Sequence, residues 1–249
     1  MIKYNYLVDY EERMGGMLKQ TNMKKIEEVA KMFLAVDIVP DKEFPFIIHH
    51  PFFNSPFVPC MFDFDTEETM ANLNTKEGQM SARKHMLKVI DMIGSYQGFL
   101  TIIMKPYLPT FFKHTKDFVS KKDYSEFLAQ MWILVEFVNS DTEITPKDFI
   151  EIFKEADKKY LMEKEELDIY KSLPDEVVIY RGVKPNSSTK ALSWSLNKET
   201  AQWFADRFEE NGKVYSAKIK KKDVLAYFDG RKEQEVVVDF TKLYDITEL

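Results

Sequence analysis

Residues 174–208 read PDEVVIYRGVKPNSSTKALSWSLNKETAQWFADRF, and this stretch decides the fold of the C-terminal part of the chain. The apolar run Val177–Tyr180 follows a proline and predicts a strand, and 191–195 predicts a second, shorter one. Asn197 then precedes a helical pattern that continues to Phe208, since asparagine is a favoured N-cap residue. The stretch therefore predicts strand, strand and helix in that order.

The segments after this stretch continue the sheet. Alternation of apolar and polar residues predicts a strand over 213–219, and short apolar runs bounded by turn residues predict the rest. Asp229-Gly230 predicts a turn shortly before Glu233 and Glu235. The further strands are expected at 224–228, 235–238 and 243–246.

The segments before Pro174 have helical spacing instead. Thr145-Pro146 is a favoured helix start, because threonine caps the first turn and proline suits its first position. Residues 40–64 hold five prolines among many aromatics, which forbids regular helix and limits strands to one or two short pieces. Helices are expected over 22–36, 81–94, 123–138 and 165–172, besides the one that Thr145 opens.

Composition indicates a folded protein of 249 residues with 45% hydrophobic and 14% aromatic residues. The net charge is −6, so an overall basic footprint for nucleic acid is absent. From Asp175 onward 13 basic residues balance 13 acidic ones, so the whole excess lies in 1–174. The sequence has one cysteine, Cys60, so no intrachain disulfide can form. No apolar run reaches the roughly 20 residues that span a bilayer, so we expect no membrane contact and a cytoplasmic location.

The C-terminal part carries two acidic residues, Glu233 and Glu235, at the expected start of a strand. Positions i and i+2 share one face of a strand, so both carboxylates can enter one cleft, where their repulsion raises one pKa. Taken alone, the pair is also typical of a solvated strand start. Arg181 at a strand end can bind phosphate or form a structural ion pair. Ser193 and Ser195 share a face as well, and alone they are compatible with an exposed edge strand.

Taken together, these pieces resemble the Arg–Ser–Glu class of ADP-ribosyltransferases, as in bacterial toxins and phage enzymes. The order Tyr180-Arg181-Gly182, Ser193-Trp194-Ser195 and Glu233-Gln234-Glu235 matches the class, and so does the aromatic-alanine pair Phe204-Ala205 in the following helix. The middle of the serine motif is usually threonine, and Trp194 departs from that pattern. Its side chain is expected to point away from the serines and to pack in the core.

The resemblance implies a role for each matching residue. Glu235 would be the catalytic glutamate, oriented by Ser193, and Glu233 would orient or deprotonate the acceptor. Arg181 would hold the NAD phosphates or brace the cleft, and the Gly182 backbone would bind the nicotinamide amide. Further contacts to NAD are implied for Ser195, Phe204 and Arg207.

We therefore expect an α+β protein with a mainly helical N-terminal region over 1–118, including the aromatic loop 40–64. An ADP-ribosyltransferase domain of two small facing β-sheets would cover 119–249. The implied activity is mono-ADP-ribosyl transfer from NAD to a macromolecule, either protein arginine or RNA or DNA. The alternatives are an NAD glycohydrolase on the same site and a non-catalytic binding module. No metal is expected, because four scattered histidines and one cysteine give no ligand spacing.

The resemblance also implies a biological setting. Members of the class include intracellular toxins, anti-phage defence effectors and phage enzymes, so an antitoxin or inhibitor is an expected partner besides NAD and the acceptor. Arg231 and Lys232, in the short loop before Glu233, would favour an acidic or nucleic-acid surface or form a solvated charge pair.

Overall fold

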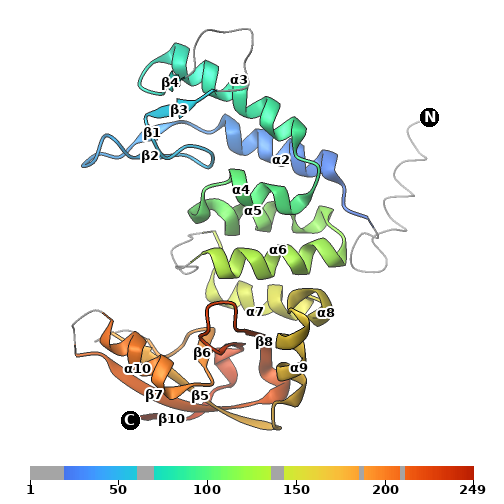
Figure 1. Cartoon of the computed structure of the whole chain (residues 1–249), viewed down its shortest axis with the longest axis vertical. Helices are drawn as coiled ribbons and strands as arrows, with labels where there is room; N and C mark the ends of the chain where they lie inside the picture. Colours follow the sequence, from blue (N-terminus) through green and yellow to red (C-terminus); the bar gives the residue numbers. More distant parts are fainter. Residues whose placement is uncertain (1–19, 61–69, 136–142, 185–187, 208–210) are drawn as a thin grey trace. The chain divides into compact units, whose positions relative to one another are not determined.

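The computed structural model describes residues 20–60, 70–135, 143–184, 188–207 and 211–249, and divides the chain into two compact units (Figure 1). The first unit is Met1–Glu143 and the second is Ile144–Leu249. Residues 61–64 of the expected aromatic loop, 136–138 of an expected helix and Phe208 lie outside the described residues. The mixture of helices with small antiparallel sheets agrees with the α+β class.

The described part of the first unit is mainly helical, with two small two-stranded sheets. Its helices are α2 (Met23–Ala35), α3 (Lys76–Met92), α4 (Phe99–Ile102), α5 (Leu108–Thr115) and α6 (Lys121–Leu134), with 3-10 turns at Tyr96–Gly98, Lys105–Tyr107 and Lys116–Phe118. Its strands pair antiparallel as β1 (Val39–Pro40) with β2 (Ile48–His49), and β3 (Phe57–Pro59) with β4 (Met70–Asn72).

Stacked aromatic rings form the core of this unit and set its boundary. Tyr96 stacks on Phe127 with ring centroids 4.2 Å apart, and Phe112 lies nearly parallel to Phe127 at 5.8 Å. Phe127 belongs to α6, so α6 packs with α4 and α5. The structure therefore divides the chain after Glu143, whereas the sequence predicted a boundary between 118 and 119. The two differ because α6 makes its contacts with α4 and α5 of the first unit.

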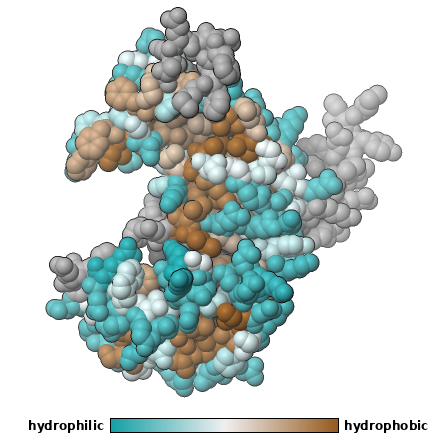
Figure 2. Space-filling model, viewed as in Figure 1, coloured by the Kyte–Doolittle hydropathy of each residue, from teal (hydrophilic) through white to brown (hydrophobic). Residues whose placement is uncertain are grey.

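The first unit has a cavity of about 600 Å³ between the β1–β2 hairpin and the turn after α4. Figure 2 shows hydrophobic residues gathered on this side of the unit. His50 lines the cavity and is fully buried, with its ring stacked 4.7 Å from Phe53. Burial lowers the pKa of His50 to about 4, and the nearby positive charge of Arg83 acts in the same direction, so the ring is neutral at physiological pH.

The second unit combines four helices with a six-stranded antiparallel sheet among its described residues. The helices are α7 (Pro146–Glu155), α8 (Lys158–Leu161), α9 (Lys164–Ser172) and α10 (Lys198–Asp206). The strands are β5 (Glu176–Val183), β6 (Ser193–Ser195), β7 (Lys213–Lys220), β8 (Val224–Phe228), β9 (Glu235–Val238) and β10 (Tyr244–Glu248), with 3-10 turns at Lys221–Asp223 and Phe240–Lys242. The predicted start of α7 is confirmed, since Thr145 caps it and forms a capping box with Asp148.

The sheet has the order β10-β7-β5-β6-β9-β8, so the expectation of two separate sheets is corrected. Its two halves meet at a single residue pair, Tyr180 in β5 opposite Ser195 in β6. By contrast, β5 pairs with β7 over eight positions. The halves are therefore hydrogen-bonded at one point and separate beyond it, which leaves room for side chains between β5 and β6.

The edge strand β8 is protected by side chains of the helices. The Tyr170 hydroxyl donates to the Val224 carbonyl at 3.2 Å, and the Lys158 ammonium donates to the Leu225 carbonyl. The Asp229 N–H, just after the strand, donates to the buried carboxylate of Glu166 at 2.8 Å. These contacts satisfy main-chain groups that a bare sheet edge would leave open to another chain.

Helix α10 lies directly against β5 because residue 182 is glycine. A Cβ atom at Gly182 would stand 2.0 Å from the Ala201 carbonyl oxygen and 2.5 Å from the Ala205 nitrogen. Ala201 and Ala205 are both buried and form a small core cluster with Val214. Close approach of the helix backbone to the strand therefore places the α10 side chains beside the gap between β5 and β6.

Candidate active site

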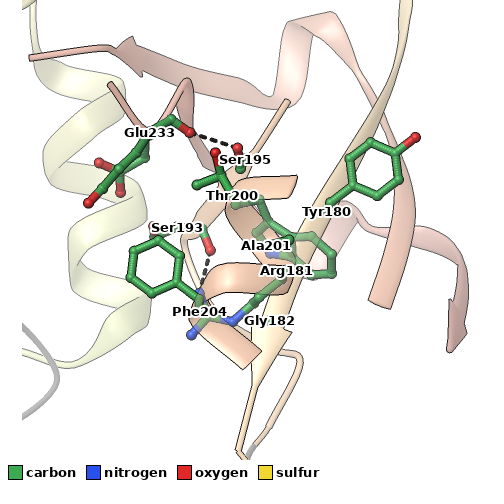
Figure 3. Close-up of a pocket in the computed structure, with 11 residues that line it drawn as sticks. Tyr180, Arg181, Gly182, Ser193, Ser195, Thr200, Ala201, Phe204 and Glu233 are labelled. Carbon is green, nitrogen blue, oxygen red and sulfur yellow. Dashed lines mark hydrogen bonds between the residues drawn. The ribbon is translucent and has the colours of Figure 1, made fainter. Parts of the chain in front are cut away.

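A pocket in the second unit collects residues from four separate segments (Figure 3). Its volume is about 80 Å³, well below the roughly 300–1,000 Å³ of pockets that enclose whole drug-sized ligands. It is too small to enclose a complete dinucleotide. The lining residues are Tyr180, Arg181 and Gly182 of β5; Ser193, Trp194 and Ser195 of β6; Thr200, Ala201 and Phe204 of α10; and Glu233 and Glu235 at the start of β9.

The guanidinium of Arg181 joins the two strands across the pocket by donating to the Ser193 carbonyl (Figure 3). Among the described residues, its Nε is buried without a hydrogen-bond partner. Burial lowers the pKa of Arg181, and the negative charge of Glu235 opposes that shift. Arg181 is thus a brace between β5 and β6 whose buried Nε donor is unused among the described residues.

Glu235 is the first residue of β9 and is 5% exposed. It lies opposite Ser195 in the β6–β9 ladder and opposite Phe228 in the β8–β9 ladder. Strands on both sides therefore fix its backbone, and its carboxylate is held at the pocket. Catalytic carboxylates need this kind of rigid support.

Glu233 reaches the same pocket by a different route from the one predicted. It precedes β9, and its neighbours Lys232 and Gln234 have φ values of 57° and 46°, so the simple alternation of a strand does not apply. Left-handed backbone at two non-glycine residues is uncommon and is kept only where surrounding contacts hold it. Both carboxylates nevertheless line the pocket.

Asp229 and Ser195 supply the contacts that hold this loop. The Asp229 carboxylate accepts the Gln234 N–H at 3.0 Å, and its carbonyl accepts the Lys232 N–H at 2.8 Å. The Ser195 hydroxyl donates to the Glu233 carbonyl at 2.7 Å and accepts the Asn197 N–H at 2.9 Å. Ser195 therefore connects the loop to the N-cap of α10, a positioning contact inside the pocket.

The Arg231 side chain contacts the two carboxylates. It is therefore not merely a solvated charge beside Lys232. Its Nη2 lies 3.1 Å from the Glu233 carboxylate and 3.6 Å from that of Glu235. Burial raises the pKa of Glu233, and the charge of Glu235 adds to this, whereas Arg231 and Arg207 oppose it. A carboxyl group with a raised pKa is suited to accept and release protons.

The other predicted residues are distributed as follows. Ser193 lines the pocket, and its main-chain carbonyl accepts the hydrogen bond from Arg181; its predicted role in orienting Glu235 stays a prediction. Phe204 is half-buried in the lining, with its ring 5.0 Å from the exposed Trp203. Arg207 is not among the lining residues; it lies over the Trp203 ring at 5.3 Å.

Trp194 packs in the core as predicted. It is 2% exposed, and its indole N–H donates to the Ala191 carbonyl at 2.9 Å. The bulky residue in the serine motif is therefore accommodated without displacing Ser193 or Ser195 from the pocket.

Sequence reasoning missed Arg231 as a partner of the carboxylates and Glu166 as an anchor of the loop. The spacing of Arg231, Glu233 and Glu235 is regular, with one residue between neighbours, and this could have indicated Arg231. Glu166 has no comparable local signal, because its contact with Asp229 spans two elements far apart in the chain. Thr200 and Ala201 were missed as lining residues, and helical spacing from Phe204 would have indicated them.

Neither metal clusters nor membrane helices occur in the parts of the chain that the structure describes. No three or more His, Cys, Asp or Glu side chains are grouped there so that they could hold a metal ion. No helix in those ranges has the length and apolar character required to cross a bilayer.

Comparison with known proteins gives no assignment: no protein-family model, curated protein or solved structure matches this chain. Its function must be inferred from the residues of the pocket.

Proposed function

We propose that the second unit is a mono-ADP-ribosyltransferase that cleaves NAD and transfers ADP-ribose to a macromolecule. The observation that carries this proposal is the convergence of Arg181, Ser193, Ser195 and Glu235 on one pocket. These residues come from three strands spread over more than fifty positions of sequence. They also include the pieces whose order resembles the Arg–Ser–Glu class. In this proposal the fold is that of the class, with the two halves of the sheet joined at the Tyr180–Ser195 pair.

The size of the pocket suits the nicotinamide end of NAD. Nicotinamide is a single ring with an amide, and it is the aromatic part of NAD that needs the least room in a pocket of about 80 Å³. Phe204 offers an aromatic face, and the backbone of Gly182 lies in the lining for the amide group. The phosphates would extend out of the pocket, where Arg207 is exposed and carries a positive charge.

Positive charge develops on the ribose when the bond to nicotinamide breaks, and Glu235 is the residue that we assign to stabilise it. A buried carboxylate with fixed backbone provides such stabilisation without reorganising during the reaction. Glu233 would accept the proton of the acceptor, for which its raised pKa is favourable. Ser193 would bind Glu235 once the ligand is present. Ser195 and Arg181 would hold the two strands and the loop in place.

The biological setting is part of the same proposal. A transferase of this class would act inside a cell as a toxin, an anti-phage defence effector or a phage enzyme, with an antitoxin or inhibitor as a partner. The first unit would then recognise the acceptor or that inhibitor.

Incubation of the full-length protein with NAD labelled on its adenylate phosphate, in a cell extract, tests the proposal. We expect nicotinamide release together with label on macromolecules. Loss of that label after protease treatment indicates a protein acceptor, and loss after nuclease treatment indicates RNA or DNA. Free ADP-ribose without bound label would show a glycohydrolase instead. The absence of nicotinamide release, with Glu235→Gln as the matched inactive control, would contradict any NAD-cleaving function and favour a binding module.

A further inference from the structure

The cavity of the first unit has the size and the lining of a binding site for a small molecule. Its volume of about 600 Å³ lies within the roughly 300–1,000 Å³ of pockets that enclose such ligands. Figure 2 shows the surface hollowed beside the β1–β2 hairpin, with hydrophobic residues gathered there. Most of the lining is apolar, and it includes Ile48, Phe53, Leu100, Ile103 and Met104. The cavity would therefore remove an apolar part of a ligand from water.

Main-chain hydrogen bonds join and stiffen the two walls of this cavity. The first wall is the segment 47–54 and the second is the segment 100–107. The Met104 N–H of the second wall donates to the Pro51 carbonyl of the first at 2.8 Å. Within the first wall, the Ile48 N–H donates to the Asn54 carbonyl at 3.2 Å. The walls are thus held before a ligand arrives, so binding would not have to order them.

The lining carries a positive charge that no acidic lining residue balances. It includes Lys105 and no aspartate or glutamate. Lys105 is exposed at the start of a 3-10 turn, and its ammonium forms no ion pair within the described ranges. His50 does not add to the charge, because burial lowers its pKa to about 4. Burial raises the pKa of the Tyr107 hydroxyl, which therefore stays protonated and can donate a hydrogen bond.

The carboxylate beside the lining is engaged in the hairpin. Asp41 lies 2.8 Å from the ring of the lining residue His49. It also accepts the N–H groups of Glu43 and Phe44 at 2.8 and 2.9 Å. These contacts hold Asp41 in the turn and leave Lys105, on the second wall, without a carboxylate partner in the described part of the chain.

We propose that this cavity binds a small carboxylic acid with an apolar body. The body would lie against Phe53, Ile103 and Met104, and the carboxylate would reach the Lys105 ammonium and the Tyr107 hydroxyl. A single negative charge matches a lining that holds one lysine and no acidic group. An uncharged ligand would gain nothing from Lys105, and a cation would be repelled by it.

Isothermal titration calorimetry of the full chain with three probes tests the charge and the body of the ligand. Decanoate and decyltrimethylammonium share an alkyl chain and differ in the sign of the head group, whereas 2-naphthylacetate replaces the chain with an aromatic ring. We expect one molecule of acid per chain, bound at least about fivefold more tightly than the cation. The acid that binds more tightly identifies the body, and it should raise the melting temperature because it binds the folded chain.

Variants at position 105 connect the binding to this cavity. Lys105→Gln removes the charge, Lys105→Arg keeps it and Lys105→Glu inverts it, and the exposed position lets all three fold. Lys24→Gln is the matched control, because it removes an exposed lysine of α2 outside the lining. We expect Lys105→Gln to weaken acid binding about three- to fivefold, as for an exposed ion pair, and Lys105→Glu to reverse the preference between the head groups. Lys105→Arg and Lys24→Gln should bind the acid like wild type.

Methyl resonances of isoleucine locate the bound acid independently of these variants. The signals of Ile48 and Ile103, which line the cavity, should shift on binding, and that of Ile219 in the second unit should not. Unmoved Ile48 and Ile103 signals, equal binding of the two head groups, equal effects of Lys105→Gln and Lys24→Gln, or no saturable binding of either acid would each overturn the proposal. The site lies in the first unit and involves no NAD chemistry, so any of these results would leave the proposed function of the second unit standing.

Discussion

The carboxylate of Glu233 lies 3.1 Å from the guanidinium of Arg231, inside the loop that leads into β9. The same guanidinium nitrogen lies 3.6 Å from Glu235, so one cation is shared by two carboxylates. This sharing lowers the cost of placing two negative charges at one pocket, because the guanidinium offsets their mutual repulsion.

The pH dependence of stability should report the raised pKa of Glu233. A carboxyl group whose pKa is higher in the folded state binds its proton more tightly there, so its contribution to stability falls as pH rises above the ordinary value near 4.5. In Glu233→Gln that dependence is absent. We expect the melting temperature of the variant, relative to wild type, to increase from acidic to neutral pH in differential scanning calorimetry. A constant difference across this range would contradict the assigned environment of Glu233.

Gly182→Ala should destabilise the second unit. The new methyl group would stand 2.0 Å from the Ala201 carbonyl, so β5 or α10 must shift, and overpacking of this kind costs about 1–3 kcal/mol or more. Gly230→Ala is the control, because a Cβ atom there meets nothing within 4 Å. Chemical denaturation, followed by the fluorescence of the tryptophans in the second unit, measures the free energy of unfolding. It should show a large decrease in this free energy for Gly182→Ala and little change for Gly230→Ala. Equal stabilities would contradict the close packing of α10.

Ser195→Ala and Ser193→Ala should have different effects. The Ser195 hydroxyl bonds both the Glu233 carbonyl and the Asn197 N–H, so its loss should cost about 1 kcal/mol of stability. The described contact of Ser193 is through its main-chain carbonyl, so its alanine variant should melt near the wild-type temperature. If Ser193 binds Glu235 when NAD is present, that variant should nevertheless release nicotinamide more slowly. A larger loss of stability in Ser193→Ala than in Ser195→Ala would contradict these positions.

Lys158→Met should change how stability varies at alkaline pH. Burial lowers the pKa of the Lys158 ammonium to about 8. The unfolded chain therefore holds this proton over the range between about 8 and the ordinary value near 10.5, and wild-type stability gains from rising pH in that range. The methionine variant lacks this gain. We expect its melting temperature relative to wild type to fall as pH rises from about 7 to about 10, and a flat difference would show an exposed lysine.

Local patterns predicted much of the second unit. Asn197 caps α10 and Thr145 caps α7 as expected, and strands occur at each predicted segment, because capping residues and apolar patterns are visible in the local sequence. The unit boundary was not predictable in this way, since Phe127 assigns α6 to the first unit through ring contacts with distant aromatics. The joining of the two sheet halves could not be predicted either, because it depends on one long-range residue pair, Tyr180 with Ser195.

The candidate site shows the same difference between residues that the local sequence indicates and residues that only distant contacts position. Arg181, Ser193, Glu233 and Glu235 were predicted as site residues from their order in the chain, and all four line one pocket. The contact of Arg231 with the carboxylates occurs in a loop where Lys232 and Gln234 have positive φ, and no glycine in the sequence marks either residue. Backbone conformations of this kind are imposed by tertiary contacts, here those of Asp229 and Ser195 with the loop.

Nicotinamide release from NAD by wild type and Glu235→Gln, measured side by side, tests the central claim most directly. Glutamine has the shape of glutamate without its charge, so the variant should keep its fold, verified by circular dichroism and melting temperature. A charge-stabilising contact of this kind contributes about 10²–10³-fold to rate, and we expect a loss at least that large. Equal turnover by a folded Glu235→Gln protein would contradict the assignment of this pocket as the active site.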